Sequence, residues 1–120
     1  MGDLYRAWAQ AIAKRPRRPA GGRINIIEVY SKMVMNRQTP RFWKAPSRKT
    51  FKDYERPFFV RDLVLAQTAP IATDDEGRSW RLRLGGATKN QASNAQRSIW
   101  LPQGPLDGEH YADVIFEEIR

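Results

Sequence analysis

The chain has 120 residues and a mass of 13.9 kDa, which suffices for one domain with a modest core. It contains no cysteine and one histidine, His110, so disulfides, cysteine zinc sites, thiol nucleophiles and multi-histidine metal sites are excluded. No apolar run approaches the roughly 20 residues that cross a membrane. The formal net charge is +8, which favours a polyanionic partner.

The positive charge is concentrated in the first half of the chain. Residues 1–56 contain 14 Lys and Arg against 4 Asp and Glu, whereas residues 57–120 contain 7 against 9. This asymmetry, together with a change in texture at Pro57, predicts a basic helical and extended N-terminal region over 1–56 and a small β-rich body over 57–120. The alternative is that the cations merely solvate an ordinary surface.

Residues 4–14 are predicted to form a helix because apolar residues recur at helical spacing on one face. Asp3 stands at the N-cap position, and Pro16 cannot continue the helix. The segment that follows, 16–23, is rich in Pro, Gly and Arg and predicts an extended basic linker. The apolar residues on the shared face are Leu4, Trp8, Ala11 and Ile12.

Residues 24–36 favour a second helix, since Ile27, Tyr30 and Val34 repeat every three or four positions. The start of this segment is rich in β-formers, so a strand remains the alternative there. Residues 37–57 contain three prolines among several aromatic residues and predict irregular chain, with a short helix opening at Ser47.

The second half of the chain has a β texture. Leucine and tryptophan alternate with arginine over residues 80–84, which is the pattern of a half-buried strand with arginines on its wet face. The predicted strands cover residues 58–67, 80–84, 98–101 and 111–119, with a short helix as the alternative for the last. Between them the sequence predicts a turn at 74–77, a polar loop at 87–96 and a turn-rich connection at 102–108.

These elements predict an α+β fold. Two N-terminal helices and a basic extended arm are followed by a small four-stranded antiparallel sheet or open barrel. We expect the core to be built in the β-rich body. The residues predicted to share that core are Leu63, Val64, Trp80, Leu82, Ile99, Val114 and Phe116.

Two basic clusters carry the functional prediction. The first lies between prolines, where guanidinium groups suit phosphate oxygens, and comprises Lys14, Arg15, Arg17, Arg18 and Arg23. The second interleaves cations with aromatic rings, as single-stranded nucleic-acid sites do, and comprises Arg37, Arg41, Phe42, Trp43, Lys44, Arg48, Lys49, Phe51 and Lys52. For each ring, the alternative role is that of a core anchor.

Arg81 and Arg83 add two cations on one strand face to the predicted nucleic-acid-binding set. The alternative is that they pair across the sheet with Glu117 or Glu118.

The sequence shows no catalytic or metal-binding constellation. Asp74, Asp75 and Glu76 are adjacent and predict a hydrated turn rather than a cation site, because consecutive side chains of an extended chain point apart. His110 has no serine or cysteine nucleophile motif to partner it and is expected to be a surface histidine. We therefore expect a non-enzymatic protein without cofactor or metal.

Residues 1–23 have the amphipathic, arginine-rich composition of a mitochondrial presequence, but Asp3 and the absence of serine before Ser31 argue against that role. We expect an intracellular, cytoplasmic protein, with the mitochondrial matrix as the alternative. The sequence as a whole predicts a nucleic-acid-binding protein, with RNA or single-stranded DNA favoured over a duplex. The alternative function is an accessory or structural subunit of a larger protein assembly, which docks through its basic N-terminal half.

Overall fold

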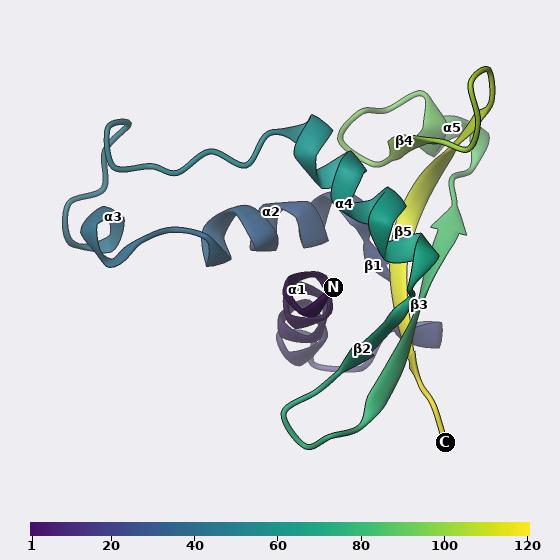
Figure 1. Ribbon diagram of the computed structural model, residues 1–120, viewed down its shortest axis with the longest axis horizontal. Coiled ribbons are helices and arrows are strands. Elements are labelled where there is room, and N and C mark those ends of the chain that lie inside the picture. Colours follow the sequence, from purple (N-terminus) through teal and green to yellow (C-terminus); the bar gives the residue numbers. More distant parts are fainter.

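A computed structural model describes residues 1–120 and shows helices packed on one face of an antiparallel sheet (Figure 1). The helical elements are α1 (Gly2–Ala13), the 3-10 turn η1 (Ala20–Gly22), α2 (Ile26–Asn36), α3 (Pro40–Lys44), α4 (Arg56–Thr68) and α5 (Lys89–Ala92). The strands are β1 (Ile24–Asn25), β2 (Ile71–Thr73), β3 (Ser79–Gly86), β4 (Ile99–Pro102) and β5 (Gly108–Glu118).

The long strand β5 organises the sheet. One of its edges pairs with β3, with Leu82 opposite Phe116, and β2 pairs with the far side of β3. Its other edge pairs with β4 near its start and with β1 near its middle, where Ile24 is opposite Val114. The predicted α+β class with an antiparallel sheet is confirmed. The sheet is open and has five strands: three of the four predicted strands, together with the short strands β1 and β2, which were not among those four.

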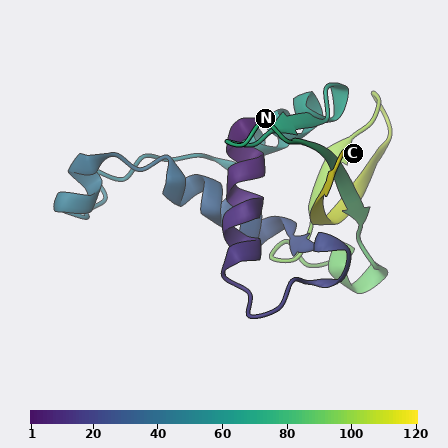
Figure 2. The ribbon, with the colours of Figure 1, turned by 90° about the horizontal axis from the view of Figure 1, so that it is seen from below.

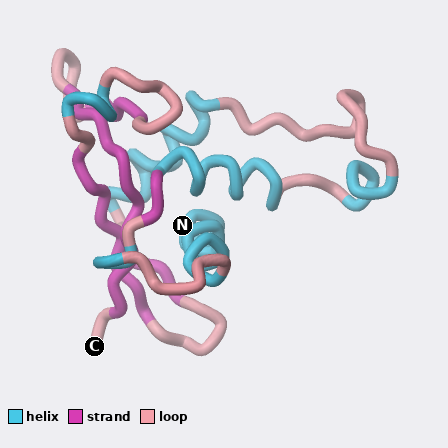
Figure 3. The backbone as a smooth tube through the Cα atoms, turned by 180° about the vertical axis from the view of Figure 1, so that it is seen from behind, coloured by secondary structure: helices cyan, strands magenta, loops and turns pink.

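Helices α1, α2 and α4 lie on the same face of the sheet, and no helix covers the opposite face (Figures 2 and 3). The core between these layers joins Trp8 of α1 and Phe59 of α4 to Phe116 of β5. Residues 1–56 and 57–120 thus contribute to one core. Of the predicted core residues, Leu63, Leu82, Ile99, Val114 and Phe116 are buried in it, and Val64 and Trp80 are partly buried against it.

The helix predicted over 4–14 is confirmed as α1, with Asp3 in its first turn rather than at the cap position, which Met1 occupies. The extended linker predicted after it is wrong, because the segment packs against α1. The Trp8 indole donates a hydrogen bond from Nε1 to the carbonyl of Gly22 at 2.8 Å. Gly22 adopts φ +66°, and a Cβ there would lie 3.2 Å from the Trp8 ring. The connection is therefore folded against α1.

The strand predicted at 58–67 is wrong, because these residues belong to helix α4. Pro57 occupies the first turn, where its missing N–H costs nothing. The buried positions Phe59, Leu63 and Ala66 follow helical spacing. Apolar residues also lie on the exposed side, at Phe58 and Leu65. An apolar run on both faces hides the period that separates a helix from a buried strand.

Three smaller predictions are also corrected by the structure. The segment 24–36 opens with β1 before α2 begins, and the Asn25 side chain caps α2 by accepting a hydrogen bond from the Ile27 amide. The short helix near Ser47 is a hydrogen-bonded turn, whereas a helix forms earlier, as α3. The polar loop at 87–96 contains α5, which begins with a capping box between Thr88 and Gln91.

The remaining predictions for the second half agree with the structure. The turn at 74–77 joins β2 to β3, and the strands predicted at 80–84 and 98–101 correspond to β3 and β4. Of the two alternatives for 111–119, the strand is confirmed as part of β5. No helix of the structure has the length and apolar character needed to cross a membrane.

Candidate nucleic-acid interface

Residues 37–55, which we call the arm from here on, leave the body at the end of α2 and return to it at the start of α4. They are distinct from the basic extended segment predicted at 16–23. The arm carries α3 and projects sideways from the sheet and its helices (Figures 1 and 2). The second predicted cluster lies entirely within it. The fold therefore gathers these cations and aromatic residues on one protruding segment.

The base of the arm is braced by Gln38, whose side chain is almost fully buried. Its amide nitrogen donates to the carbonyl oxygens of Val34 and Lys52, each at 2.8 Å, and its amide oxygen accepts from the Lys52 N–H at 2.8 Å. The Tyr30 hydroxyl donates to the carbonyl of Tyr54 at 2.6 Å. These contacts tie the outgoing and returning chains to each other and to α2, so the arm has a fixed base.

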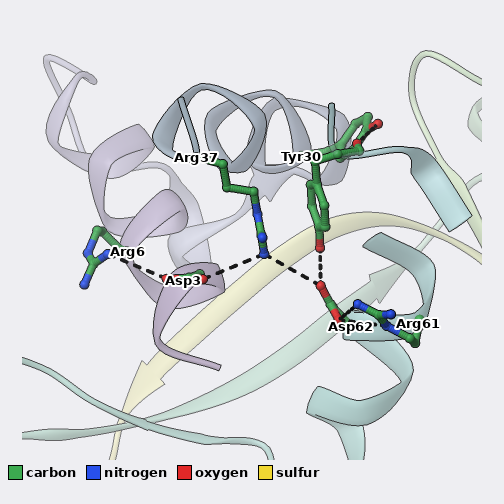
Figure 4. A network of polar contacts seen from close by, with 7 residues as sticks. Asp3, Arg6, Tyr30, Arg37, Arg61 and Asp62 are labelled. Atoms are coloured by element: carbon green, nitrogen blue, oxygen red, sulfur yellow. Dashed lines mark hydrogen bonds and ion pairs between the residues drawn. The ribbon is translucent and has the colours of Figure 1, made fainter. Parts of the chain in front are cut away.

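Arg37 anchors the same region from inside the arm. Its guanidinium stacks on the Tyr54 ring at 4.0 Å from the centroid and lies between Asp3 and Asp62, at 3.8 and 3.9 Å (Figure 4). The Tyr54 hydroxyl donates a hydrogen bond to Asp62. Burial, followed by this bond, raises the pKa of Tyr54 well above its usual range. Arg37 therefore belongs to the arm's support and is not free for a ligand.

The far end of the arm is held by short polar contacts. The Thr39 hydroxyl caps α3 by accepting from the Phe42 amide at 3.3 Å. In the turn that follows, the Ser47 amide donates to the Thr50 hydroxyl oxygen at 3.1 Å, and the Thr50 hydroxyl donates to the Ala45 carbonyl at 2.9 Å. These bonds give the tip a defined backbone without a core of its own.

Apart from Tyr54 at its base, the arm has three aromatic rings, Phe42, Trp43 and Phe51, which pack together. Phe42 lies edge-on to Trp43 at 5.2 Å and to Phe51 at 5.7 Å between ring centroids. None of them joins the hydrophobic core. Trp43 is 58% exposed and Phe51 is 36% exposed. The role of core anchor, which was the alternative for each ring, does not fit this placement, and the rings present faces to solvent.

The arm is strongly positive. Residues 37–52 contain six Lys and Arg and no Asp or Glu. Apart from Arg37, none of these cations forms an ion pair with the rest of the protein. The unpaired cations, all exposed, are Arg41, Lys44, Arg48, Lys49 and Lys52. Holding like charges together on one segment favours the binding of an anion.

Several cations of the first predicted cluster interact with other residues of the protein. Arg15 donates two hydrogen bonds to Glu28, at 2.6 and 3.0 Å. Arg18 lies over the Trp8 ring at 5.8 Å, and Arg23 pairs with Asp113 at 3.2 Å. Lys14 and Arg17 form no ion pair. The cluster is therefore spread over a folded connection and does not form one extended surface.

Arg81 and Arg83 flank the buried Leu82 along β3, so they lie on the side of the strand that faces away from the core, and β3 itself lies far from α3 and the arm (Figure 1). Arg83 pairs with Glu117 on the neighbouring strand at 3.1 Å, which is the cross-strand alternative that the sequence allowed. Arg81 stands opposite Glu117 in register but forms no ion pair with it. Arg23 of the first cluster reaches the same side of β3, because its guanidinium lies against Gly85 beside its partner Asp113, whereas the second cluster lies on the arm.

In the 74–77 turn, the Asp74 carboxylate accepts hydrogen bonds from neighbouring residues of the turn and of β3. Asp74 accepts hydrogen bonds from the amides of Glu76 and Arg78, each at 2.9 Å, and from the Trp80 indole at 3.0 Å. The indole bond, more than the others, lowers the pKa of Asp74. No group of three or more His, Asp or Glu side chains is arranged to hold a metal ion. His110 is exposed on β5, opposite Trp100.

Comparison with known proteins adds no further evidence on function. No protein-family model, curated protein or solved structure matches this chain. The functional argument therefore rests on the geometry and charge of the chain itself.

Proposed function

We propose that this protein is a non-enzymatic binder of single-stranded nucleic acid, with RNA favoured, and that the arm is its main contact surface. The observation that carries the proposal is the combination of five unpaired cations and two exposed aromatic rings on one protruding, braced segment. Cations bind the phosphate backbone, and exposed rings stack with bases that are not paired in a duplex.

The shape of the arm supports a single strand over a duplex. Trp43 and Phe51 are exposed, and each packs against Phe42. A base can therefore approach their rings directly. In a duplex the bases are stacked on each other, and a protein reads its major groove with an inserted helix or a two-stranded ribbon. The only helix in the arm, α3, has 5 residues.

The alternative function is that of an accessory subunit whose arm docks on another protein. The same exposed rings favour it, because aromatic residues and arginine are enriched at protein interfaces. The two functions differ in their dependence on salt. Nucleic-acid binding releases counterions in proportion to the phosphates contacted, whereas a ring-centred protein interface depends much less on salt.

The test is the fluorescence anisotropy of a labelled oligouridine titrated with the protein at several salt concentrations. If the five arm cations contact phosphates, log K falls with log[salt] at a slope of about −3.5. Changing Arg41, Lys44 and Lys49 to Gln should flatten the slope by about two units. The matched control changes Lys89, Arg97 and Arg120 to Gln, which removes the same charge from exposed, unpaired positions on the body.

A control variant with the parent's slope and an arm variant with a flattened one would support the proposal. Equal slopes for the two variants would show that only net charge matters and would remove the arm from the interface. A parent protein that binds no oligonucleotide at low salt would overturn the proposed function and favour the accessory subunit.

A further inference from the structure

A groove beside the arm combines charge, amide groups and an aromatic wall. It runs between the C-terminal half of α1 and the adjoining face of α2 and ends at the α3 residue Trp43, with a volume of about 750 Å³. Its lining includes Gln10, Lys14, Ser31, Lys32, Met35 and Trp43. Lys32 was not part of either predicted cluster, yet the fold places it together with one residue from each.

Two lysines from different helices, Lys14 after α1 and Lys32 in α2, line this one groove. Interaction with Lys14 is the largest cause of a lowered pKa at Lys32. Two adjacent like charges destabilise one another, and an anion placed between them relieves the repulsion. Such a pair has the charge and the donors to hold one phosphate group.

The one acid in the lining, Glu28, does not neutralise this pair. Its carboxylate is held by both terminal nitrogens of Arg15, at 2.6 and 3.0 Å. Arg15 therefore cancels the charge of Glu28, and the positive charge of Lys14 and Lys32 stays available to a ligand.

The floor of the groove offers neutral hydrogen-bonding groups. The Asn36 amide donates to the Gln10 side-chain oxygen at 2.9 Å, which bridges α2 to α1. The other N–H of Asn36, both N–H groups of the Gln10 amide and the hydroxyl of Ser31 remain for a ligand. Such groups suit the edges of a base or a sugar hydroxyl, while the Trp43 indole at the end of the groove suits the face of a base.

We infer that this groove holds one nucleotide of a bound single strand, with a backbone phosphate between Lys14 and Lys32 and its base against the Trp43 indole. The inference rests on the proposed function and extends the binding surface from the arm onto the body. It also assigns a ligand-binding role to Lys32. A groove of this volume lies within the range of small-molecule sites, and its lining residue Trp43 belongs to the arm, where the cations for the rest of the strand lie.

The first experiment measures oligouridine binding by anisotropy with Lys14 and Lys32 both changed to Gln. We expect binding to weaken roughly 10-fold at low salt and the salt slope to flatten by about 0.7, because the two lysines together contact one phosphate. The matched control changes Lys89 and Arg97 to Gln and should bind within about twofold of the parent, because Lys89 belongs to α5 and Arg97 to the connection from α5 to β4, and α5 lies far from α1, α2 and α3 (Figure 1).

The second experiment needs no variant. Surface lysines of the parent are acetylated with and without a saturating oligouridine, and the extent at each lysine is read by mass spectrometry. We expect the oligonucleotide to protect Lys14 and Lys32 and to leave Lys89 reactive.

The outcomes separate this inference from the proposed function. If the parent binds and the triple arm variant binds weakly, but the double lysine variant matches the parent and acetylation of Lys14 and Lys32 is unchanged, the groove is not a nucleotide site and the proposed function stands. If the parent binds no oligonucleotide, both fail.

Discussion

Gln38 is the residue on which the arm's geometry depends most, so its replacement by Leu is a sharp test. Leucine has a similar volume but neither donates nor accepts. The change removes three hydrogen bonds of 2.8 Å and leaves the N–H and carbonyl of Lys52 and the carbonyl of Val34 without this partner. A buried polar group without a partner costs about 1–3 kcal/mol, and the Val34 carbonyl has other partners within reach at the end of α2. We expect a loss of about 2–3 kcal/mol.

Because 1.36 kcal/mol corresponds to a factor of ten, this loss predicts a fall of roughly 30- to 150-fold in the equilibrium constant that closes the base of the arm. Urea unfolding gives the global free energy, and hydrogen exchange at the Lys52 amide, which donates to Gln38, and at the Phe51 amide, which donates to Ser47, reports whether the arm opens without the body. The control is Gln96→Leu, at an exposed position whose side chain makes no hydrogen bond, and it should stay within about 0.5 kcal/mol of the parent. Parent-like stability and exchange in Gln38→Leu would refute the brace.

Two further predictions concern the packing beneath β3. Trp80→Ala should cost about 3 kcal/mol in urea unfolding, since the ring packs on Tyr5 and Trp8 with centroids 5.5 and 5.8 Å apart; a loss below about 1 kcal/mol would remove Trp80 from the core. The Asp74 pKa lies below its ordinary value of 3.8, so its stabilising effect is present above that value and is lost as the pH falls through the lowered pKa. Asp74→Asn should therefore lower stability at neutral pH and weaken the acid dependence of the urea midpoint, and an unchanged acid dependence would show that Asp74 does not contribute.

The sequence predicts elements well where one period dominates. Apolar residues at helical spacing predicted α1, and strict alternation predicted β3. It fails at α4, where exposed Phe58 and Leu65 add to the buried positions and the apolar run no longer shows one period. The capping box of α5, Thr88 with Gln91, was a local signal that the composition of the segment obscured.

The candidate site could be predicted only in part, for a different reason. The interleaving of cations with aromatic rings over residues 37–52 is a local property, and it predicted the second basic cluster. The ion pairs of Arg15 with Glu28 and of Arg23 with Asp113 depend on tertiary packing, so they cannot be predicted from the spacing of residues in the sequence. The same holds for Lys32, whose helix was predicted but whose position across from Lys14 is set by how α1 and α2 pack.

The central claim is that the arm contacts single-stranded nucleic acid, and photocrosslinking tests it most directly. An oligouridine carrying 4-thiouridine is mixed with the protein at a concentration that anisotropy shows to be saturating. The complex is irradiated, and the crosslinked peptides are mapped by mass spectrometry. The account predicts crosslinks within residues 40–52, with Trp43 and Phe51 as the foremost sites, because their rings are exposed where bases stack. Crosslinks confined to residues 57–120, or none at saturation, would contradict it.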